Sequence, residues 1–197
     1  MSPEATYTPV EADTLLAQYS SGVSVATSLA GDSVSYSITP SWRYPDMVPS
    51  MLTNGTGGGF GQPLTANWVG FAADPTGAVS VTVDLGGHKS FAAVRTLFAG
   101  SATSGIYFPQ SVVVEYSSDG GLSWFSLGSP NGQKVEMDTP LLYAVGWVDA
   151  TNWTPIVASH VRVTVNFHQW LFIGEIKVMG PEASARLYGA PASEWPR

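Results

Sequence analysis

Val79-Ser80-Val81-Thr82-Val83-Asp84-Leu85-Gly86 opens the stretch that decides the fold, residues 79–124. Apolar and polar residues alternate along it, which predicts a strand with one face in a core and the other in water. The stretch continues to Val112-Val113-Val114-Glu115-Tyr116, a β-branched strand, and then to Asp119-Gly120-Gly121, a turn signal before a returning strand that carries Trp124. Strands and turns without an attached catalytic constellation are the pattern of a binding module.

Composition favours a single all-β domain. Of the 197 residues, 44% are hydrophobic and only 12% are charged, and the chain contains 21 Gly and 14 Pro. Low charge with many turn-forming residues is typical of a β-sandwich. A chain of this length buries a core without needing disulfides or metals. The net charge of −7 argues against nucleic acid as a partner, because a phosphate backbone demands a basic patch, and also against anionic lipid.

Residue types also argue against several kinds of catalysis. The chain has no cysteine, which excludes thiol catalysis and zinc–thiolate sites, and its three histidines are dispersed without a metal-binding spacing. Asp84, Asp119 and Asp138 fall at strand ends or turns, where Asp commonly bends the backbone. The sequence contains no persuasive pair of carboxylates for glycoside hydrolysis. We therefore expect that the protein is not an enzyme. No apolar run is long enough to span a bilayer, and no signal peptide is visible.

The chain divides into an N-terminal extension at residues 1–20, a β-sandwich at residues 21–180 and a C-terminal tail at residues 181–197. Between residues 40 and 76 it is irregular and rich in Gly, Pro and Trp, which is typical of a functional or metal-ordered insert. Arg95 and Arg162 fall inside strands and are expected to point outward or pair with carboxylates. The expected strands cover residues 23–29, 34–38, 78–85, 92–99, 111–116, 123–127, 141–148, 157–165 and 171–178.

Residues 22–180 resemble a discoidin-type domain, also called a coagulation-factor C-type or galactose-binding-like domain. Each motif is short, but seven of them occur in the family's order. They are Tyr44-Pro45-Asp46, Leu52-Thr53-Asn54-Gly55, Trp68-Val69-Gly70-Phe71, Val81-Thr82-Val83-Asp84-Leu85-Gly86, Gly105-Ile106 with Pro109, Tyr116-Ser117-Ser118-Asp119-Gly120 and Glu175-Ile176-Lys177-Val178. Many bacterial members are carbohydrate-binding modules attached to glycoside hydrolases. The resemblance implies an all-β jelly-roll sandwich of about eight main strands, with binding loops at one end.

The resemblance also implies a structural calcium ion. In the family this site lies in a Leu-Thr-Asp-Gly loop and is closed by a Glu near the last strand. Asn54 replaces that Asp here, Glu175 matches the closing Glu, and Thr56 is a further candidate ligand. Asn keeps an oxygen ligand but removes one negative charge, so calcium affinity should be lower than in the family. Alternatively, Asn54 and Gly55 form only a turn and Glu175 is a solvated strand residue.

Aromatic residues on presumed loops are candidate sugar ligands, because sugar sites combine an exposed ring with polar groups that fix orientation. Family topology tends to bring these loops to one end of the sandwich. Other aromatic residues, such as Trp68 and Trp124, are expected in the core. The candidate ligand-binding residues are Trp42, Arg43, Tyr44, Tyr107, Phe108, Asn166, His168 and Trp170.

The sequence therefore predicts a non-catalytic carbohydrate-binding module. It would belong to, or partner, a secreted or surface glycan-processing system, with an extracellular or cell-surface location. The alternative is a structural or adhesive surface or virion protein that self-associates through its sandwich and through arms at residues 1–19 and 181–197. Fold alone does not decide between them.

Overall fold

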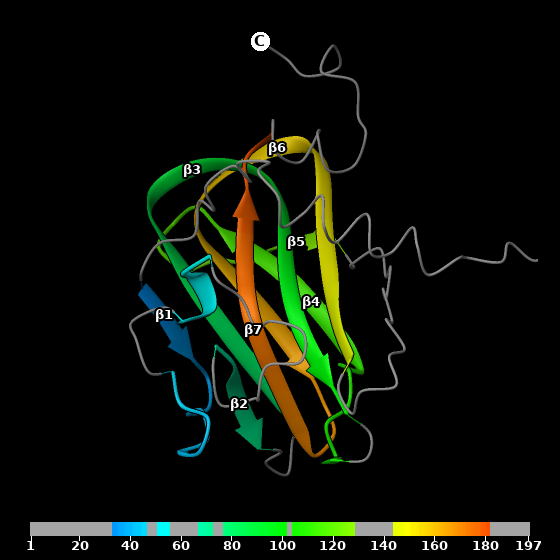
Figure 1. Ribbon diagram of the computed structural model, residues 1–197. Helices are drawn as coiled ribbons and strands as arrows, with labels where there is room; N and C mark the ends of the chain where they lie inside the picture. Colours follow the sequence, from blue (N-terminus) through cyan, green and yellow to red (C-terminus); the bar gives the residue numbers. More distant parts are fainter. Residues whose placement is uncertain are drawn as a thin grey trace, which may run out of the picture.

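The computed structural model describes residues 33–46, 51–55, 67–72, 77–101, 104–128 and 144–181 (Figure 1). Strands dominate these residues, and every pair of neighbouring strands is antiparallel. No helix among them is long and apolar enough to cross a membrane. The elements are β1 (Ser33–Tyr36), the 3-10 turn η1 (Met51–Thr53), β2 (Val69–Ala72), β3 (Ala78–Gly100), β4 (Ser111–Ser117), β5 (Phe125–Gly128), β6 (Ala144–Asn166) and β7 (Trp170–Met179).

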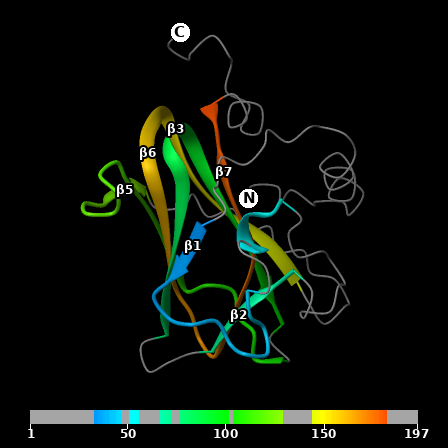
Figure 2. The same ribbon diagram turned by 90° about the vertical axis from the view of Figure 1, so that its left-hand side faces the viewer.

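Two 23-residue strands, β3 and β6, run through both layers of the sandwich. Residues 78–84 of β3 pair with residues 160–166 of β6, and residues 93–100 pair with residues 144–151. Between these segments the register shifts twice, and both strands arch over one end of the molecule (Figures 1 and 2). We call this end the bend. The opposite end, at the bottom of Figure 1, is called the loop end.

The strand order follows from the two arches. One layer contains β2, β7, the second half of β3 and the first half of β6. The other contains β1, the first half of β3, the second half of β6, β4 and β5. This arrangement confirms the predicted all-β jelly-roll sandwich.

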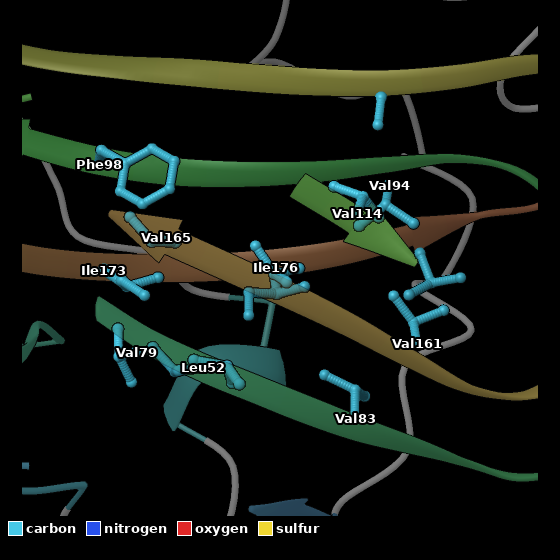
Figure 3. Packing of buried hydrophobic residues seen from close by; sticks show 14 of the residues in the cluster. Leu52, Val79, Val83, Val94, Phe98, Val114, Val161, Val165, Ile173 and Ile176 are labelled. Atoms are coloured by element: carbon cyan, nitrogen blue, oxygen red, sulfur yellow. The ribbon is translucent and has the colours of Figure 1, made fainter. Parts of the chain in front are cut away.

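The main core lies between the layers. Val79, Val81 and Val83 are at most 1% exposed, whereas the polar residues between them are half-buried, as their alternation predicts. Figure 3 shows valines of β3 and β6 meeting Phe98, Ile173 and Ile176 of the other layer. Full burial of such a side chain contributes roughly 1.5–3 kcal/mol relative to exposure.

A second, smaller cluster lies on the outer face of the β2–β7 layer. Ile173 pairs with Phe98 and both point into the main core, so the adjacent pair of Phe172 and Ala99 points the other way. Trp68, Leu97 and Ile106 complete the buried part of this cluster, with half-buried aromatic residues packed against it. This outer cluster supports the loop end of the sandwich.

The structure differs from the predicted elements in three places. Residues 78–85 and 92–99 were expected as separate strands but are one bent strand, and the same holds for residues 144–148 and 157–165. Strand β2 lies within residues 40–76, which were expected to be irregular. Trp68 is buried as expected, but Trp124 is only half-buried, with the Arg162 guanidinium 4.1 Å from its ring centroid.

Some predicted segments lie outside the described residues. These are the N-terminal extension, the strand at residues 23–29, residues 141–143 of a later strand, and the C-terminal tail beyond Pro181. The domain boundaries at residues 20 and 180, and the two arms of the self-association alternative, therefore stay predictions.

Candidate functional site

Three connections meet at the loop end: residues 37–46 after β1, residues 104–110 before β4 and residues 167–169 between β6 and β7 (Figure 1). The eight residues predicted to bind ligand lie on these connections or at the first or last residue of the adjoining strand. The structure therefore brings these connections to one end of the sandwich, as the family resemblance implies. The side chains nevertheless have different roles there.

Trp42 and Arg43 occupy the two central positions of a tight turn. The Tyr44 amide donates to the Ser41 carbonyl at 2.9 Å, which closes the turn. The Ser41 amide donates to the Gly70 carbonyl at 2.7 Å, and the Gly70 amide donates to the Tyr44 carbonyl at 3.0 Å. These two bonds attach the turn to the free edge of β2, so this strand holds Trp42 and Arg43 in place.

The turn forms one wall of a groove of about 530 Å³. This volume lies within the roughly 300–1,000 Å³ range of small-molecule sites. Trp42 is 82% exposed, although the Arg43 guanidinium lies 5.1 Å from its ring centroid, so much of the indole faces solvent. The groove is lined by Thr39, Pro40, Ser41, Trp42, Arg43, Ala72 and Trp170.

Tyr44 packs against Trp170, one of the residues that line the groove. Its ring centroid lies 4.7 Å from that of Phe172 and 5.9 Å from that of Trp170, both in edge-on geometry. Trp170 in turn stacks on Phe172, with centroids 6.0 Å apart. Tyr44 is half-buried and packs against the outer cluster, so its ring fixes the orientation of Trp170.

Tyr107 and His168 form a second pair of rings beside Trp170. Their centroids are 5.8 Å apart, Tyr107 is 39% exposed, and His168 is also exposed. Ile106, next to Tyr107 in sequence, forms a parallel bridge with Trp170. Backbone bonds between Ser101 and Ile106, at 2.7 and 2.9 Å, hold this loop against the sheet.

Phe108 and Asn166 are not brought into the groove. Phe108 is partly buried and packs against the main core, where its ring lies close to Gly100. The Asn166 side-chain amide donates a hydrogen bond to Ser111 Oγ at 2.7 Å. The backbone carbonyl of Asn166 accepts a hydrogen bond from the Gln110 amide at 2.8 Å. Both residues brace the loop end.

Asp46 anchors the segment that carries the turn. Its carboxylate accepts hydrogen bonds from the Tyr36 hydroxyl and, at 3.0 Å, from the Met51 amide. Burial, followed by this hydrogen bond and the charge of Asp46, raises the pKa of the Tyr36 phenol well above its ordinary value. Tyr36 therefore stays a neutral donor, and Asp46 ties the segment to both β1 and η1.

The residues predicted to bind calcium lie partly together. Glu175 is completely buried, and its Oε1 accepts a hydrogen bond from the Gly55 amide at 3.0 Å. The expectation of a solvated Glu175 is therefore wrong. Asn54 adjoins Gly55 and is exposed, whereas Thr56 lies outside the described residues. The Asn54-Gly55 segment thus contacts Glu175 through the Gly55 amide.

One group of residues resembles a hydrolytic triad in composition only. Ser159 Oγ lies 2.9 Å from His160 Nδ1, and His160 Nε2 lies 3.9 Å from Asp84 Oδ1. Ser159 is buried, and its hydroxyl donates to the Ser117 carbonyl at 3.2 Å, so it is not presented to a substrate. Within the described ranges, no group of three or more His, Cys, Asp or Glu residues could hold a metal ion.

Four residues of the groove are not among the predicted ligand-binding residues: Thr39, Pro40, Ser41 and Ala72. The Thr-Pro-Ser run before Trp42 is a turn signal that could have identified the first three. Ala72 carried no comparable signal, because it enters the groove only through its pairing with Trp170.

The fold and the groove define a discoidin-like β-sandwich domain. A profile of the F5/8 type C domain family matches residues 33–176, more than half of the chain. The chain therefore belongs to the F5/8 type C domain family. A comparison with curated proteins gave no match.

Solved structures share the fold at low sequence identity. Chitosan-binding module 1 of a chitosanase/glucanase from Paenibacillus sp. IK-5 is 17% identical, with a TM-score of 0.51, and the match covers 78% of this chain and 98% of that chain. A GH29 fucosidase of Ruminococcus gnavus, a mutant in complex with fucose, is also 17% identical, with a TM-score of 0.51. That match covers 78% of this chain but only 26% of the fucosidase. At these identities the likeness shows the fold alone.

Proposed function

We propose that this domain binds carbohydrate, without catalysing a reaction, in the groove between Trp42, Arg43 and Trp170. The observation that carries the proposal is an 82%-exposed tryptophan held on a hydrogen-bonded turn beside a second tryptophan. Because most of the Trp42 indole lies in solvent, its burial contributes little to folding. Its rigid placement suits a ligand that covers the ring.

Sugar rings match the chemistry of this groove. A pyranose presents a face of C–H groups that packs on an aromatic ring, surrounded by hydroxyls that need hydrogen-bond partners. Arg43 has no carboxylate partner among the described residues, whereas Arg95 and Arg162 are each bonded to one at 2.8 Å. The Arg43 donors are therefore available for sugar hydroxyls or for the carboxylate of an acidic sugar.

The shared fold supports this proposal. One structural neighbour is named as a chitosan-binding module, and another belongs to a fucosidase solved with fucose. By analogy, this domain holds a glycan-processing system close to its polysaccharide and raises the effective concentration of substrate. With this role we propose an extracellular or cell-surface location.

A glycan array tests the proposal. Purified protein should bind a defined class of glycan, and Trp42→Ala and Trp170→Ala should each weaken that binding by roughly tenfold or more. Leu122→Ala is the matched control, because Leu122 is 87% exposed but lies before β5, in the β4–β5 connection. A folded protein that binds no glycan, or equal binding by all four proteins, would contradict the proposal.

We also propose a structural calcium ion at Glu175. A completely buried carboxylate favours a nearby cation, and Asn54, next to the Gly55 amide that bonds to Glu175, has a side-chain oxygen of the kind that calcium prefers. The donor set thus fits the ion. Glu175, Asn54 and, by sequence, Thr56 would hold it, and its chemistry would be to neutralise Glu175 and order the loop.

Thermal unfolding tests the calcium proposal without any glycan. Added calcium should raise the melting temperature of the wild type, chelator should reverse the increase, and magnesium should have little effect. Glu175→Gln should abolish the response, whereas Glu115→Gln, a change at a half-buried carboxylate paired with Arg162, should preserve it. A melting temperature that is the same with calcium and with chelator would exclude the site.

A further inference from the structure

The loop end carries two separate ring surfaces, and only one of them lines the groove. The first consists of Trp42 and Trp170, which line the groove together with Arg43. The second is the Tyr107–His168 pair, which is exposed but does not contribute to the groove lining. An exposed ring pair on a backbone-bonded loop has the same features that make Trp42 a candidate sugar platform.

The strand register relates the backbone positions beside the two surfaces. Trp170 pairs with Ala72 on one side and with Ile106 on the other. Neighbouring strands lie about 4.8 Å apart, so Ala72 in the groove and Ile106 beside Tyr107 are roughly 10 Å apart. This span exceeds one pyranose ring but lies within the reach of a short glycan chain.

The second surface is fixed in place by the close approach of two loops. A Cβ atom at Gly105, where φ is +72°, would lie 2.6 Å from Gln169 Oε1. Gln169 itself has a φ of +60°, a left-handed conformation that costs a non-glycine residue free energy. It lies between His168 of the second surface and Trp170 of the first.

We infer that the site takes two or three neighbouring units of a glycan chain, with one unit in the groove and another on the Tyr107–His168 pair. This inference rests on the proposed carbohydrate-binding function and adds a second subsite to it. Trp170 lies between the subsites and contributes to the first. The ligand class is therefore an oligosaccharide or polysaccharide, bound more tightly than the single sugar.

Calorimetric titration against glycans of increasing length tests the inference. The probes are glucosamine oligomers, cello-oligosaccharides and oligogalacturonates of one to six units. The titration uses the series that belongs to the glycan class bound on the array. The Kd should fall at least tenfold from monomer to trimer and then level off. Tyr107→Ala should raise the Kd of the trimer roughly fivefold to tenfold and leave that of the monomer unchanged.

Two variants serve as controls. Tyr107→Phe keeps the ring and should keep most of the length dependence, whereas Trp42→Ala should weaken monomer and trimer together. Equal affinity at all lengths, or an equal loss of monomer and trimer binding in Tyr107→Ala, would overturn the second subsite and leave the groove in place. A blank array would instead overturn the proposed function itself, and the second subsite with it.

Discussion

At position 70 the groove depends on a missing side chain. A Cβ atom there would lie 2.7 Å from the Tyr44 Cβ and 2.9 Å from the Phe172 Cε1. The turn that carries Trp42 can attach to the edge of β2 only because Gly70 leaves this space free. The motif that contains Gly70 is visible in the sequence, but the reason for the glycine is visible only in the packing.

Gly70→Ala should therefore displace the turn. We expect a loss of about 1–3 kcal/mol in the free energy of unfolding, as for other overpacked sites, together with a clear loss of glycan affinity. Chemical denaturation and calorimetry measure the two effects. Val83→Ala, a core change in the other layer, should lower stability but preserve affinity. Unchanged affinity in Gly70→Ala would show that the turn does not need this anchor.

Thr96 carries a buried hydroxyl, and its Oγ1 has no hydrogen-bond partner among the residues that the structure describes. Its cross-strand neighbour Ile176 lies in the main core, so the hydroxyl faces apolar side chains. Thr96→Val keeps the shape and removes the unsatisfied group, which should stabilise the fold by about 1 kcal/mol and raise the melting temperature by about 2–4 °C. A lower melting temperature would reveal a partner for the hydroxyl.

At the scale of elements, the β4–β5 turn is organised by one carboxylate. Asp119 accepts hydrogen bonds from the Ser123 amide at 2.9 Å, from the Ser117 hydroxyl at 2.7 Å and from the Leu122 amide at 3.1 Å. These bonds, with the Ser123 amide first, lower the pKa of Asp119 to about 2. The charged form is thus favoured in the folded protein.

The stability contributed by Asp119 should depend on acid in a defined window. It is fully present above the ordinary Asp pKa of about 3.9 and is lost as the pH falls toward 2. Asp119→Asn should therefore be less stable than the wild type at neutral pH and should show a shallower loss of stability between about pH 4 and pH 2. Parallel slopes for the two proteins in denaturant titrations across this window would contradict the assignment.

Strands were predictable where they depend on the local sequence pattern. They were unpredictable where they depend on pairing with distant strands of the sandwich. The alternation in residues 79–85 correctly indicates a strand with one buried face. The run Gly86-Gly87-His88-Lys89 is exposed, and it bends the strand instead of ending it. Gly86 and Gly87 have positive φ values that permit this bend. Continuity across it comes from pairing with β6, which a local reading of the sequence does not reveal.

At the scale of the whole molecule, topology decides which candidate residues meet. The family resemblance implied that three distant connections lie at one end, and the structure shows them there. The sequence could not separate Trp42, which is exposed, from Phe108, which packs into the core, since both are aromatic residues on loops. That difference arises from the contact with Gly100 and from the attachment of the turn to β2.

Charge also acts at this scale. The chain has a net charge of −7, and the described ion pairs neutralise Arg95 and Arg162 with carboxylates. Arg43 is left at the groove without such a partner among the described residues. The Arg43 guanidinium can therefore donate hydrogen bonds to neutral or acidic groups of the proposed sugar ligand, although the molecule as a whole is acidic.

The central claim is that a glycan occupies the loop end of the sandwich, and amide chemical-shift mapping of the labelled protein tests it most directly. With the glycan that binds on the array, the account predicts the largest shifts in residues 41–44 and 168–170, with little change in the β4–β5 hairpin. Largest shifts in that hairpin, or anywhere away from the loop end, would contradict the account.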